Sequence, residues 1–212
     1  MADKEKYDFR IDDASKVFFT SDTHFNHYNI IASCGRPFKD EIEMNEVFIK
    51  NWNSVVDDDS VVFHLGDFAW GGFKKWKDVR DRLNGNIILI KGNHDHKNGP
   101  RTSEQEDLLF EYVTYQMYLR IEGKQVYLNH FPFLCYSGVY RDPKDVVYQL
   151  YGHVHSGQNS KNGMDLPRLE YAFPTQYDVG VDNNNYTPVS WREVDEKIKN
   201  QIKDSDFYKN ET

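Results

Sequence analysis

Five short polar motifs stand in one order along the 212-residue chain, and each follows an apolar segment. They are Asp22-Thr23-His24, Gly66-Asp67, Gly92-Asn93-His94-Asp95, His130 and Gly152-His153-Val154-His155. The preceding segments are short and apolar, which is typical of buried strands. Because functional side chains in α/β folds gather at strand ends, the motifs are predicted to form one polar site. An H-x-H or G-D pair is common by chance, so the inference depends on the ordered set.

The first half of the chain alternates between strand-like and helix-like patterns. Strands are predicted at Lys16–Ser21, Ser60–Leu65 and Asn86–Lys91. Apolar residues at helical spacing predict a helix over 41–56, with Met44, Phe48, Trp52 and Val55 on one face. A second helix is predicted from Phe73, Trp76, Val79 and Leu83.

The second half contains mostly strands and ends in a helix. Tyr112–Ile121 and Gln125–Asn129 are predicted to form a hairpin, and Val146–Tyr151 and Tyr177–Val181 are predicted as further strands. A capping box at 190–193 (Ser-Trp-Arg-Glu) predicts the start of the last helix. Strands alternate with helices in the first half of the chain, and hairpin-like strands dominate the second half. This order fits two mixed β-sheets that pack face to face, with helices on the outside. The predicted fold class is therefore α/β.

Length and composition indicate one domain. The chain has 212 residues, 39% of them hydrophobic and 15% aromatic, which excludes wholesale disorder and allows a sizeable core. No internal repeat or long linker divides the sequence. A single domain is expected over 1–212, with a short lead at 1–15 and a frayed tail at 204–212.

Charge and cysteine content limit the expected partners and compartment. The formal net charge of −8 argues against an extended nucleic-acid interface. The first residues lack the apolar core of a signal peptide, and the longest apolar segments are too short to cross a bilayer. Cys34 and Cys135 provide no disulfide framework. We therefore expect a cytoplasmic protein without membrane contact, and the sequence indicates no oligomeric state.

The side chains of the five motifs are of the kinds that bind transition metals. Asp22 and His24 are one residue apart, so on an extended backbone both leave the same face and can share a cation. His153 and His155 repeat this spacing. Carboxylate, imidazole and amide ligands without thiolate favour Mn²⁺, and Fe, Ni²⁺ or Zn²⁺ also fit. For any one of these residues taken alone, the alternative is an ordinary buried polar group.

The ordered motifs resemble those of the calcineurin-like metallophosphoesterase superfamily, and the resemblance spans roughly Val17 to Val181. It implies a four-layer αββα sandwich of two mixed sheets flanked by helices. It also implies two divalent transition-metal ions at the strand ends, about 3.5–4 Å apart. In this pattern one metal takes Asp22, His24, Asp67 and His155. The other takes Asp67, Asn93, His130 and His153, with Asp67 bridging the two.

The same resemblance implies catalytic roles for the two residues after Asn93. His94 would stabilise phosphoryl oxygens or protonate the leaving oxygen, and Asp95 would hold the His94 ring and its tautomer. The alternative is a turn histidine that caps the next helix. A water between the two metals would lose its proton near neutral pH and attack phosphorus in line, without a covalent enzyme intermediate.

A narrower resemblance covers residues 24–38, 44–45, 52–53 and 64–68, which are similar to small stand-alone phosphoesterases of bacteria and bacteriophages. It implies that His27 and Arg36 line the substrate site, with Arg36 as a fork for a phosphate. The alternative is that both are exposed loop residues. The chain departs from the group at Asn26, where glycine is usual, and at Trp70, where many relatives carry aspartate.

The leading function is hydrolysis of small phosphodiesters such as nucleotides. His94 can assist a leaving alkoxide, and the arginines near the motifs occur singly rather than clustered for a dianion. Aromatic residues that could stack on a base are Phe25, Tyr28, Trp70 and Tyr136, with core or lid packing as the alternative. Competing functions are a phosphomonoesterase or protein phosphatase, a nuclease, and a non-catalytic interaction scaffold of the same fold.

Overall fold

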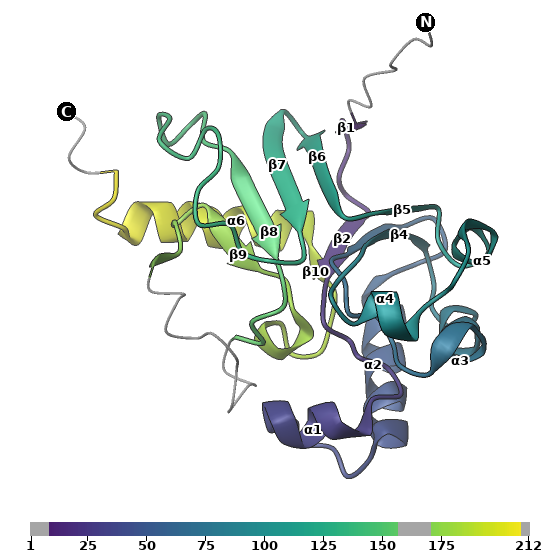
Figure 1. Ribbon diagram of the computed structural model, residues 1–212. Coiled ribbons are helices and arrows are strands. Elements are labelled where there is room, and N and C mark those ends of the chain that lie inside the picture. The colour runs from purple at the N-terminus through teal and green to yellow at the C-terminus, as the bar shows by residue number, and fades with distance from the viewer. Residues whose placement is uncertain (1–8, 157–170, 209–212) are drawn as a thin grey trace, which may run out of the picture.

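The computed structural model describes residues 9–156 and 171–208, and Figure 1 shows their arrangement. Its strands are β1 (Phe9–Ile11), β2 (Val17–Thr20), β3 (Val61–His64), β4 (Asn86–Ile90), β5 (Tyr112–Thr114), β6 (Gln116–Ile121), β7 (Lys124–Asn129), β8 (Tyr148–Tyr151), β9 (Gln176–Asp178) and β10 (Val189–Ser190). Its helices are α1 (Tyr28–Cys34), α2 (Glu41–Val55), α3 (Gly72–Arg80), α4 (Asp95–Asn98), α5 (Ser103–Asp107) and α6 (Trp191–Asp204), with a 3₁₀ helix at Val181–Asn183. The strands form two five-stranded sheets. The α/β class predicted from the sequence is confirmed.

The first sheet contains the first three predicted strands. Its order is β10-β2-β3-β4-β5, in which β2 to β5 run parallel and β10 is antiparallel to β2. Side chains alternate between the two faces, so that Val62 packs against helices and Phe63 packs toward the other sheet. Because both faces are buried, these strands appear in the sequence as continuous apolar segments.

The second sheet has the order β1-β6-β7-β8-β9, with β6 and β7 antiparallel and the other pairs parallel. The predicted hairpin turn is present between β6 and β7. Glu122 and Gly123 have φ values of 47° and 82°, the positive pair that a two-residue type I′ turn requires. Both sheets are therefore mixed, as expected.

The main core lies between the two sheets. It contains Phe19 and Phe63 from the first sheet and Leu119, Leu128 and Leu150 from the second. Helix α6 adds Trp191, Val194 and Ile198 to this core. The predicted capping box begins this helix, because the Ser190 side chain accepts from the Glu193 amide and the Glu193 side chain accepts from the Ser190 amide.

A second core joins the first sheet to α1, α2 and α3, which lie on the side of that sheet away from the second sheet (Figure 1). The buried helical residues include Met44, Phe48, Trp52, Trp76 and Val79. They pack against the outward side chains Val62, Ile87 and Leu89 of β3 and β4. The two helices predicted from apolar spacing are thus present. Two of the predicted residues differ, because Val55 at the end of α2 is 40% exposed and Leu83 lies beyond the end of α3.

One predicted strand is in fact two strands in different sheets. Residues 112–114 pair with β4 as β5, whereas residues 116–121 pair with β1 and β7 as β6. The chain crosses between the sheets at Tyr115, which is exposed. β-type residues continue through the crossing, so the local pattern does not mark the point where the pairing partner changes.

The two ends of the described chain contact the rest of the fold. Phe9–Ile11, within the expected lead, forms the edge strand β1 beside β6. Beyond α6, the Tyr208 hydroxyl donates to the Val139 carbonyl at 2.7 Å. The rest of the expected lead and tail, residues 1–8 and 209–212, lies outside the described residues. Among the helices described, none has the length and apolar character needed to cross a bilayer.

Candidate metal centre

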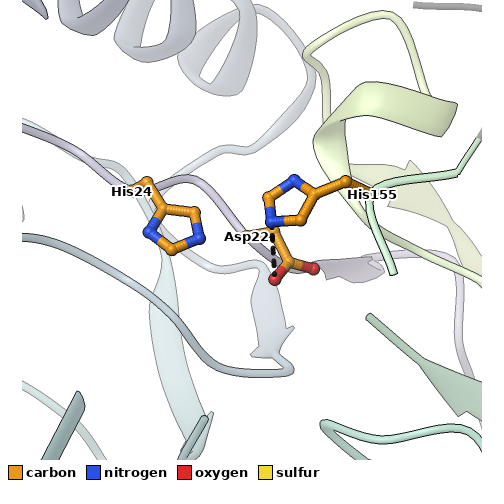
Figure 2. A group of neighbouring side chains, drawn as sticks. All are labelled: Asp22, His24 and His155. Atoms are coloured by element: carbon orange, nitrogen blue, oxygen red, sulfur yellow. Dashed lines mark ion pairs between the residues drawn. The ribbon is translucent and has the colours of Figure 1, made fainter. Parts of the chain in front are cut away.

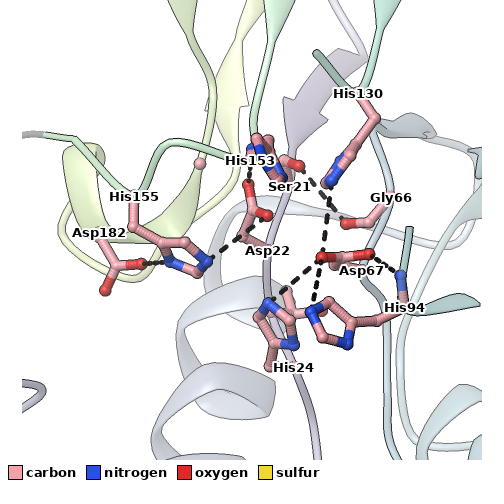
Figure 3. Close-up of polar contacts among 12 residues, drawn as sticks. Ser21, Asp22, His24, Gly66, Asp67, His94, His130, His153, His155 and Asp182 are labelled. Atoms are coloured by element: carbon pink, nitrogen blue, oxygen red, sulfur yellow. Dashed lines mark hydrogen bonds and ion pairs between the residues drawn. The ribbon is translucent and has the colours of Figure 1, made fainter. Parts of the chain in front are cut away.

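The polar motifs follow the ends of strands from both sheets. Asp22, Asp67 and Asn93 come after β2, β3 and β4, which run parallel in the first sheet. His130 and His153 come after β7 and β8, which run parallel in the second. Figure 3 shows Asp22, Asp67, His130 and His153 in one cluster. The fold thus brings together residues as far apart as Asp22 and His153, which are separated by 131 positions.

Backbone hydrogen bonds set the relative positions of the motifs. The Asp22 amide donates to the Gly66 carbonyl at 3.0 Å, and the His24 amide donates to the Asp67 carbonyl at 2.9 Å. From the other sheet, the His153 amide donates to Asp22 Oδ2 at 2.8 Å. The side chains at the centre are therefore carried by segments that are tied to one another rather than by free loops.

Most of the predicted ligands have a left-handed backbone conformation. The φ values are 58° at Asp22, 48° at His24, 56° at Asp67, 70° at His153 and 47° at His155. Such values are uncommon for residues other than glycine and cluster at functional sites. The extended geometry predicted for the two i, i+2 pairs is therefore wrong. Their side chains converge because the backbone turns at each residue.

Two glycines allow the backbone to approach the central carboxylates. A Cβ atom at Gly92 would overlap Asp67 Oδ1, and a Cβ atom at Gly152 would overlap Asp22 Oδ2. Any larger residue would displace the loop from the carboxylate it contacts. This close approach explains why glycine precedes Asn93 and His153.

Asp22, His24 and His155 form the first group that could hold a metal ion (Figure 2). One ligand atom from each lies within 4.8 Å of the others. His155 Nε2 is 3.8 Å from Asp22 Oδ1. All three residues are buried, so their polar atoms have little access to water.

Asp67, His130 and His153 form the second such group, also within 4.8 Å of one another. The Asn93 side-chain oxygen lies 3.0 Å from His130 Nε2, which places it beside this group. Asp67 Oδ2 is 3.5 Å from His24 Nε2 and 3.5 Å from His130 Nε2 (Figure 3). The Asp67 carboxylate therefore stands between the two groups, in the position that a bridging ligand needs.

The chemistry of these atoms fits a divalent cation. In the described part of the chain, Asp22 Oδ1 and His24 Nε2 are buried without a hydrogen-bond partner. Burial, together with the charges of Asp22 and Asp95, raises the pKa of Asp67 to about 9. A nearby cation would restore the ionised carboxylate. Burial also lowers the pKa of His24 well below its usual range, which favours the neutral imidazole that binds metals.

Two histidines of the centre are oriented by hydrogen bonds from their outer ring nitrogens. His130 Nδ1 is 2.7 Å from the Leu65 carbonyl, which can only accept, so this nitrogen donates and Nε2 is left facing Asp67. His155 Nδ1 is 2.7 Å from Asp182 Oδ2 (Figure 3). Outer partners of this kind fix the tautomer and orientation of metal-binding histidines. Asp182 was not predicted, although a carboxylate directly after the predicted strand at 177–181 is a signal that could have identified it.

Arg36 supports Asp182 and does not line the substrate site. Its side chain is fully buried, and Nε and Nη2 donate to the two Asp182 oxygens at 2.9 and 2.8 Å. Nη2 and Nη1 also donate to the carbonyls of Asp22 and Thr23, at 2.7 and 3.2 Å. Burial acts to raise the pKa of Asp182, but the charge of Arg36 lowers it to about 2. The predicted phosphate contact is wrong because the guanidinium fork already holds a carboxylate.

His94 lies at the edge of the centre, with 37% of its side chain exposed. Its Nε2 atom is 4.0 Å from Asp67 Oδ2 (Figure 3). Its amide donates to Asp67 Oδ1 at 2.8 Å, which fixes the backbone beside the central carboxylate. The imidazole can therefore reach both the centre and a molecule bound in front of it.

Asp95 has a different contact from the one predicted. Its buried carboxylate accepts from the amides of Asp67, Phe68 and Gly92, at 2.8, 2.9 and 2.7 Å. These bonds occupy both oxygens, so the carboxylate joins the two loops at the ends of β3 and β4. The predicted contact with the His94 ring is replaced by this backbone role.

His27 and Trp70 form a stacked pair next to the first group. Their ring centroids are 4.2 Å apart with an interplanar angle of 12°. His27 Nδ1 also lies 3.4 Å from His24 Nδ1. Burial lowers the pKa of His27 to about 4, so its ring is neutral near pH 7. In place of the aspartate that many relatives carry, Trp70 contributes an aromatic surface.

The other aromatic residues predicted to stack on a base lie elsewhere. Phe25 is fully buried in the core under α2, and Tyr28 is exposed on α1. The Tyr136 hydroxyl is hydrogen-bonded to Thr175 at 2.5 Å. Phe131, which was not predicted, packs against the rings of His130 and His153. Its position directly after His130 is the only sequence signal for this contact.

Known proteins share this combination of motifs and fold. Residues 16–166 match the calcineurin-like phosphoesterase superfamily domain. The chain therefore belongs to the calcineurin-like phosphoesterase superfamily. As a member, it is a metal-dependent phosphoesterase, and divalent metal ions are its expected cofactors.

Similar proteins come from archaea, bacteria and phages. An uncharacterised protein of Methanocaldococcus jannaschii is 34% identical over 177 residues, covering 82% of this chain and 86% of that protein. The Gene 66 protein of Mycobacterium phage L5 is 29% identical over 170 residues, covering 67% of this chain and 78% of that protein. A crystal structure of a protein of unknown function from Aquifex aeolicus is 27% identical with a TM-score of 0.61, covering 85% of this chain and 97% of that one. The phage relative agrees with the predicted likeness to small phage phosphoesterases.

Proposed function

We propose that this phosphoesterase hydrolyses small phosphodiesters, such as nucleotides, at a centre that binds two divalent metal ions. The observation that carries the proposal is the Asp67 carboxylate, which stands 3.5 Å from a histidine of each ligand group. The first ion would be held by Asp22, His24, Asp67 and His155. The second would be held by Asp67, Asn93, His130 and His153. Mn²⁺ is favoured, and Fe, Ni²⁺ and Zn²⁺ also suit oxygen and nitrogen ligands.

Bound ions would polarise the phosphoryl group and lower the pKa of a water molecule. The protein's own contribution is orientation and proton transfer. Asp182 and the Leu65 carbonyl fix the rings of His155 and His130. His94, exposed at the edge of the centre, is positioned to donate a hydrogen bond to the phosphoryl oxygens or a proton to the leaving oxygen. His27 would line the same side of the substrate.

The arginines support a diester rather than a monoester substrate. A phosphate monoester is a dianion that needs more cationic partners than a diester. Arg36 is committed to Asp182, Arg101 donates to the Lys97 carbonyl, and Arg141 donates to Gln125 Oε1. In the described residues, none of these three arginines is directed to the centre. Because these three arginines have other partners, the described residues favour a singly charged ester.

A paired assay tests the substrate class. The metal-reconstituted protein is expected to hydrolyse bis(4-nitrophenyl) phosphate with a higher kcat/KM than 4-nitrophenyl phosphate. The two esters share a leaving group, so the difference reports the number of ester bonds. A strong preference for the monoester in Mn²⁺, Ni²⁺ and Zn²⁺ would make the protein a phosphomonoesterase or protein phosphatase. Cyclic nucleotides and dinucleotides, assayed in parallel, identify the natural class.

Metal analysis tests the alternative of a non-catalytic scaffold. The purified protein is expected to bind two divalent ions per chain, because all the proposed ligands are present and gathered. Elemental analysis of protein dialysed against Mn²⁺ measures this directly. A chain that retains no transition metal and hydrolyses neither ester would support the scaffold and contradict the proposed function.

A further inference from the structure

Two exposed aromatic rings lie next to different histidines of the centre. Trp70 is 36% exposed, and its ring centroid lies 5.8 Å from that of His94. Phe131 is 44% exposed, and its ring centroid lies 4.9 Å from that of His130. Figure 3 shows His94 and His130 on opposite sides of the Asp67 carboxylate. Trp70 and Phe131 therefore lie next to histidines that stand on different sides of the Asp67 carboxylate.

The Trp70 ring is held in a defined plane. His27 covers one face of the indole, with the ring planes 12° apart. The Trp70 amide donates to the Phe25 carbonyl at 2.7 Å, which ties the residue to the loop that carries His24. An exposed indole supported in this way offers a flat surface to an aromatic group and loses little freedom when one binds.

The Phe131 ring is held on the other side. It packs edge-on against His153, with centroids 4.6 Å apart and an angle of 63°. Its amide donates to Asn129 Oδ1 at 2.8 Å, which fixes the backbone at the end of β7. Large exposed apolar side chains are individually common on protein surfaces. Here, however, Phe131 contacts two histidines of the second ligand group. Trp70 stacks on His27, which itself contacts His24 of the first group.

We propose that Trp70 and Phe131 are specificity-determining residues, which bind the two ester arms of a phosphodiester that carries a planar aromatic group on each arm. A short dinucleotide is the biological class with this chemistry. This inference rests on the proposed diesterase function and narrows it. Stacking on an aromatic side chain tolerates any base, because each base has a π-face.

The residues next to Trp70 and Phe131 indicate which ester arm each ring binds. His94 is the proposed proton donor to the leaving oxygen, and Trp70 lies beside it. Trp70 therefore binds the arm that leaves. Phe131 lies beside His130 and His153, on the side away from His94, and binds the arm that stays on phosphorus.

Two phosphodiesters with the same leaving group can distinguish the role of Trp70 from that of Phe131. Bis(4-nitrophenyl) phosphate has an aromatic group on both arms, whereas methyl 4-nitrophenyl phosphate has one only on the leaving arm. Phe131→Ala is expected to lower kcat/KM for the bis ester by about tenfold and to leave the methyl ester unchanged. Trp70→Ala is expected to lower kcat/KM for both esters by a similar factor. Tyr140→Ala removes a ring that is 63% exposed and packs against Phe173 and Phe207 rather than against a residue of the centre, and it should change neither.

A binding measurement supplies a readout without turnover. Three of the four tryptophans, Trp52, Trp76 and Trp191, are buried, so ligand-dependent fluorescence changes report mainly Trp70. Diphenyl phosphate is expected to change the tryptophan fluorescence of the Mn²⁺-loaded protein and to inhibit it, whereas dimethyl phosphate does neither. Trp70→Phe should remove the fluorescence change and keep most of the inhibition, because a phenyl ring remains.

The possible results distinguish a failure of the aromatic-arm inference from a failure of the proposed diesterase function on which it rests. A wild-type protein that binds metal but hydrolyses neither diester would contradict the proposed function itself. Equal kcat/KM for the two diesters, with equal inhibition by diphenyl and dimethyl phosphate, would overturn the aromatic-arm inference alone. An equal loss for both esters in Phe131→Ala would overturn the assignment of the arms. Near-ultraviolet circular dichroism and metal content verify that each variant is folded and loaded.

Discussion

At the scale of single residues, the centre depends on carboxylates that have different partners. Asp67 faces histidines from both ligand groups, at 3.5 Å in each case. Asp182 holds His155, and Asp95 holds backbone amides. A buried carboxylate is costly unless it is paired. The different partners therefore indicate different roles, with Asp67 as the proposed metal ligand and Asp95 and Asp182 as supports.

Asp67→Asn is expected to reduce both metal content and turnover while the fold remains. An amide is a weaker ligand than a carboxylate and carries no charge to balance two cations. Loss of even an outer partner of a metal ligand costs about 10–100-fold in metal affinity or activity, so loss of the bridging ligand should exceed this range. Elemental analysis, bis(4-nitrophenyl) phosphate hydrolysis and circular dichroism measure the three quantities. Near-normal turnover with saturating Mn²⁺ would contradict the bridging assignment.

His94→Ala is expected to retain its metals and lose activity by about 10²–10⁴-fold, the usual range for a general acid. The loss should be larger for esters with poor leaving groups, because these depend most on protonation. Kinetics with a series of substituted phenyl esters, together with metal analysis, measure this. If metal content falls in proportion to activity, His94 is a ligand and the division of roles is incorrect.

At the scale of elements, the site consists of strand ends joined by buried side chains. Arg36, just after α1, contacts Asp182 in the 3₁₀ helix after β9 and the carbonyls after β2. Asp95 at the start of α4 joins the loop after β3 to the loop after β4. The Arg36 contacts link segments from both sheets. Together with the Asp95 contacts, they explain how short loops keep the backbone of the proposed ligands in left-handed conformations.

Arg36→Leu is expected to lower the free energy of unfolding by about 3–5 kcal/mol, because it leaves the Asp182 carboxylate buried and unpaired. Chemical denaturation of the metal-loaded protein measures the change. Combining Arg36→Leu with Asp182→Leu should recover part of the loss, since the unpaired charge is then removed. Unchanged stability of Arg36→Leu would contradict the supporting role of this ion pair.

At the scale of the whole molecule, the two sheets supply one edge where several buried carboxylates lie close together. Asp22, Asp67 and Asp95 are buried near one another, and burial with the charges of Asp22 and Asp95 raises the pKa of Asp67 to about 9. The unfolded chain would release this proton near pH 4. Folding without metal therefore requires that Asp67 keep a proton that it loses readily when unfolded.

Metal removal is therefore expected to make stability depend on pH. A group with a raised folded-state pKa contributes stability that is fully present below its unfolded pKa and is lost as pH rises toward its folded pKa. In a chelator, the melting temperature should fall as pH rises from 6 to 9. With Mn²⁺ the fall in melting temperature should be smaller, because the metal ion binds the ionised carboxylate of Asp67. Chelated Asp67→Asn, which has no such proton, should show a clearly smaller fall, with the remainder due to His155, whose pKa is, despite burial, also raised by its contact with Asp182. Equal slopes with and without metal in the wild type would contradict this account.

Residue types and short-range patterns in the sequence determined much of this protein. The predicted helices with Met44 and Trp76 on their buried faces, the strands before the motifs and the capping box at Ser190 are all present. The residues able to bind metal could be named for the same reason. Helical periodicity, strand alternation and ligand chemistry are properties of neighbouring residues, so they can be read along the chain.

Only the tertiary structure decided which distant residues contact one another. Arg36 and Asp182 are 146 positions apart, and Asp95 contacts the Asp67 amide from 28 positions away. The crossing at Tyr115 and the place of Phe131 beside His153 also depend on which strands pair. A charged or aromatic side chain has the same local signature whether it meets a substrate or a buried partner. Its role is set by the packing of the two sheets, and no local pattern contains that information.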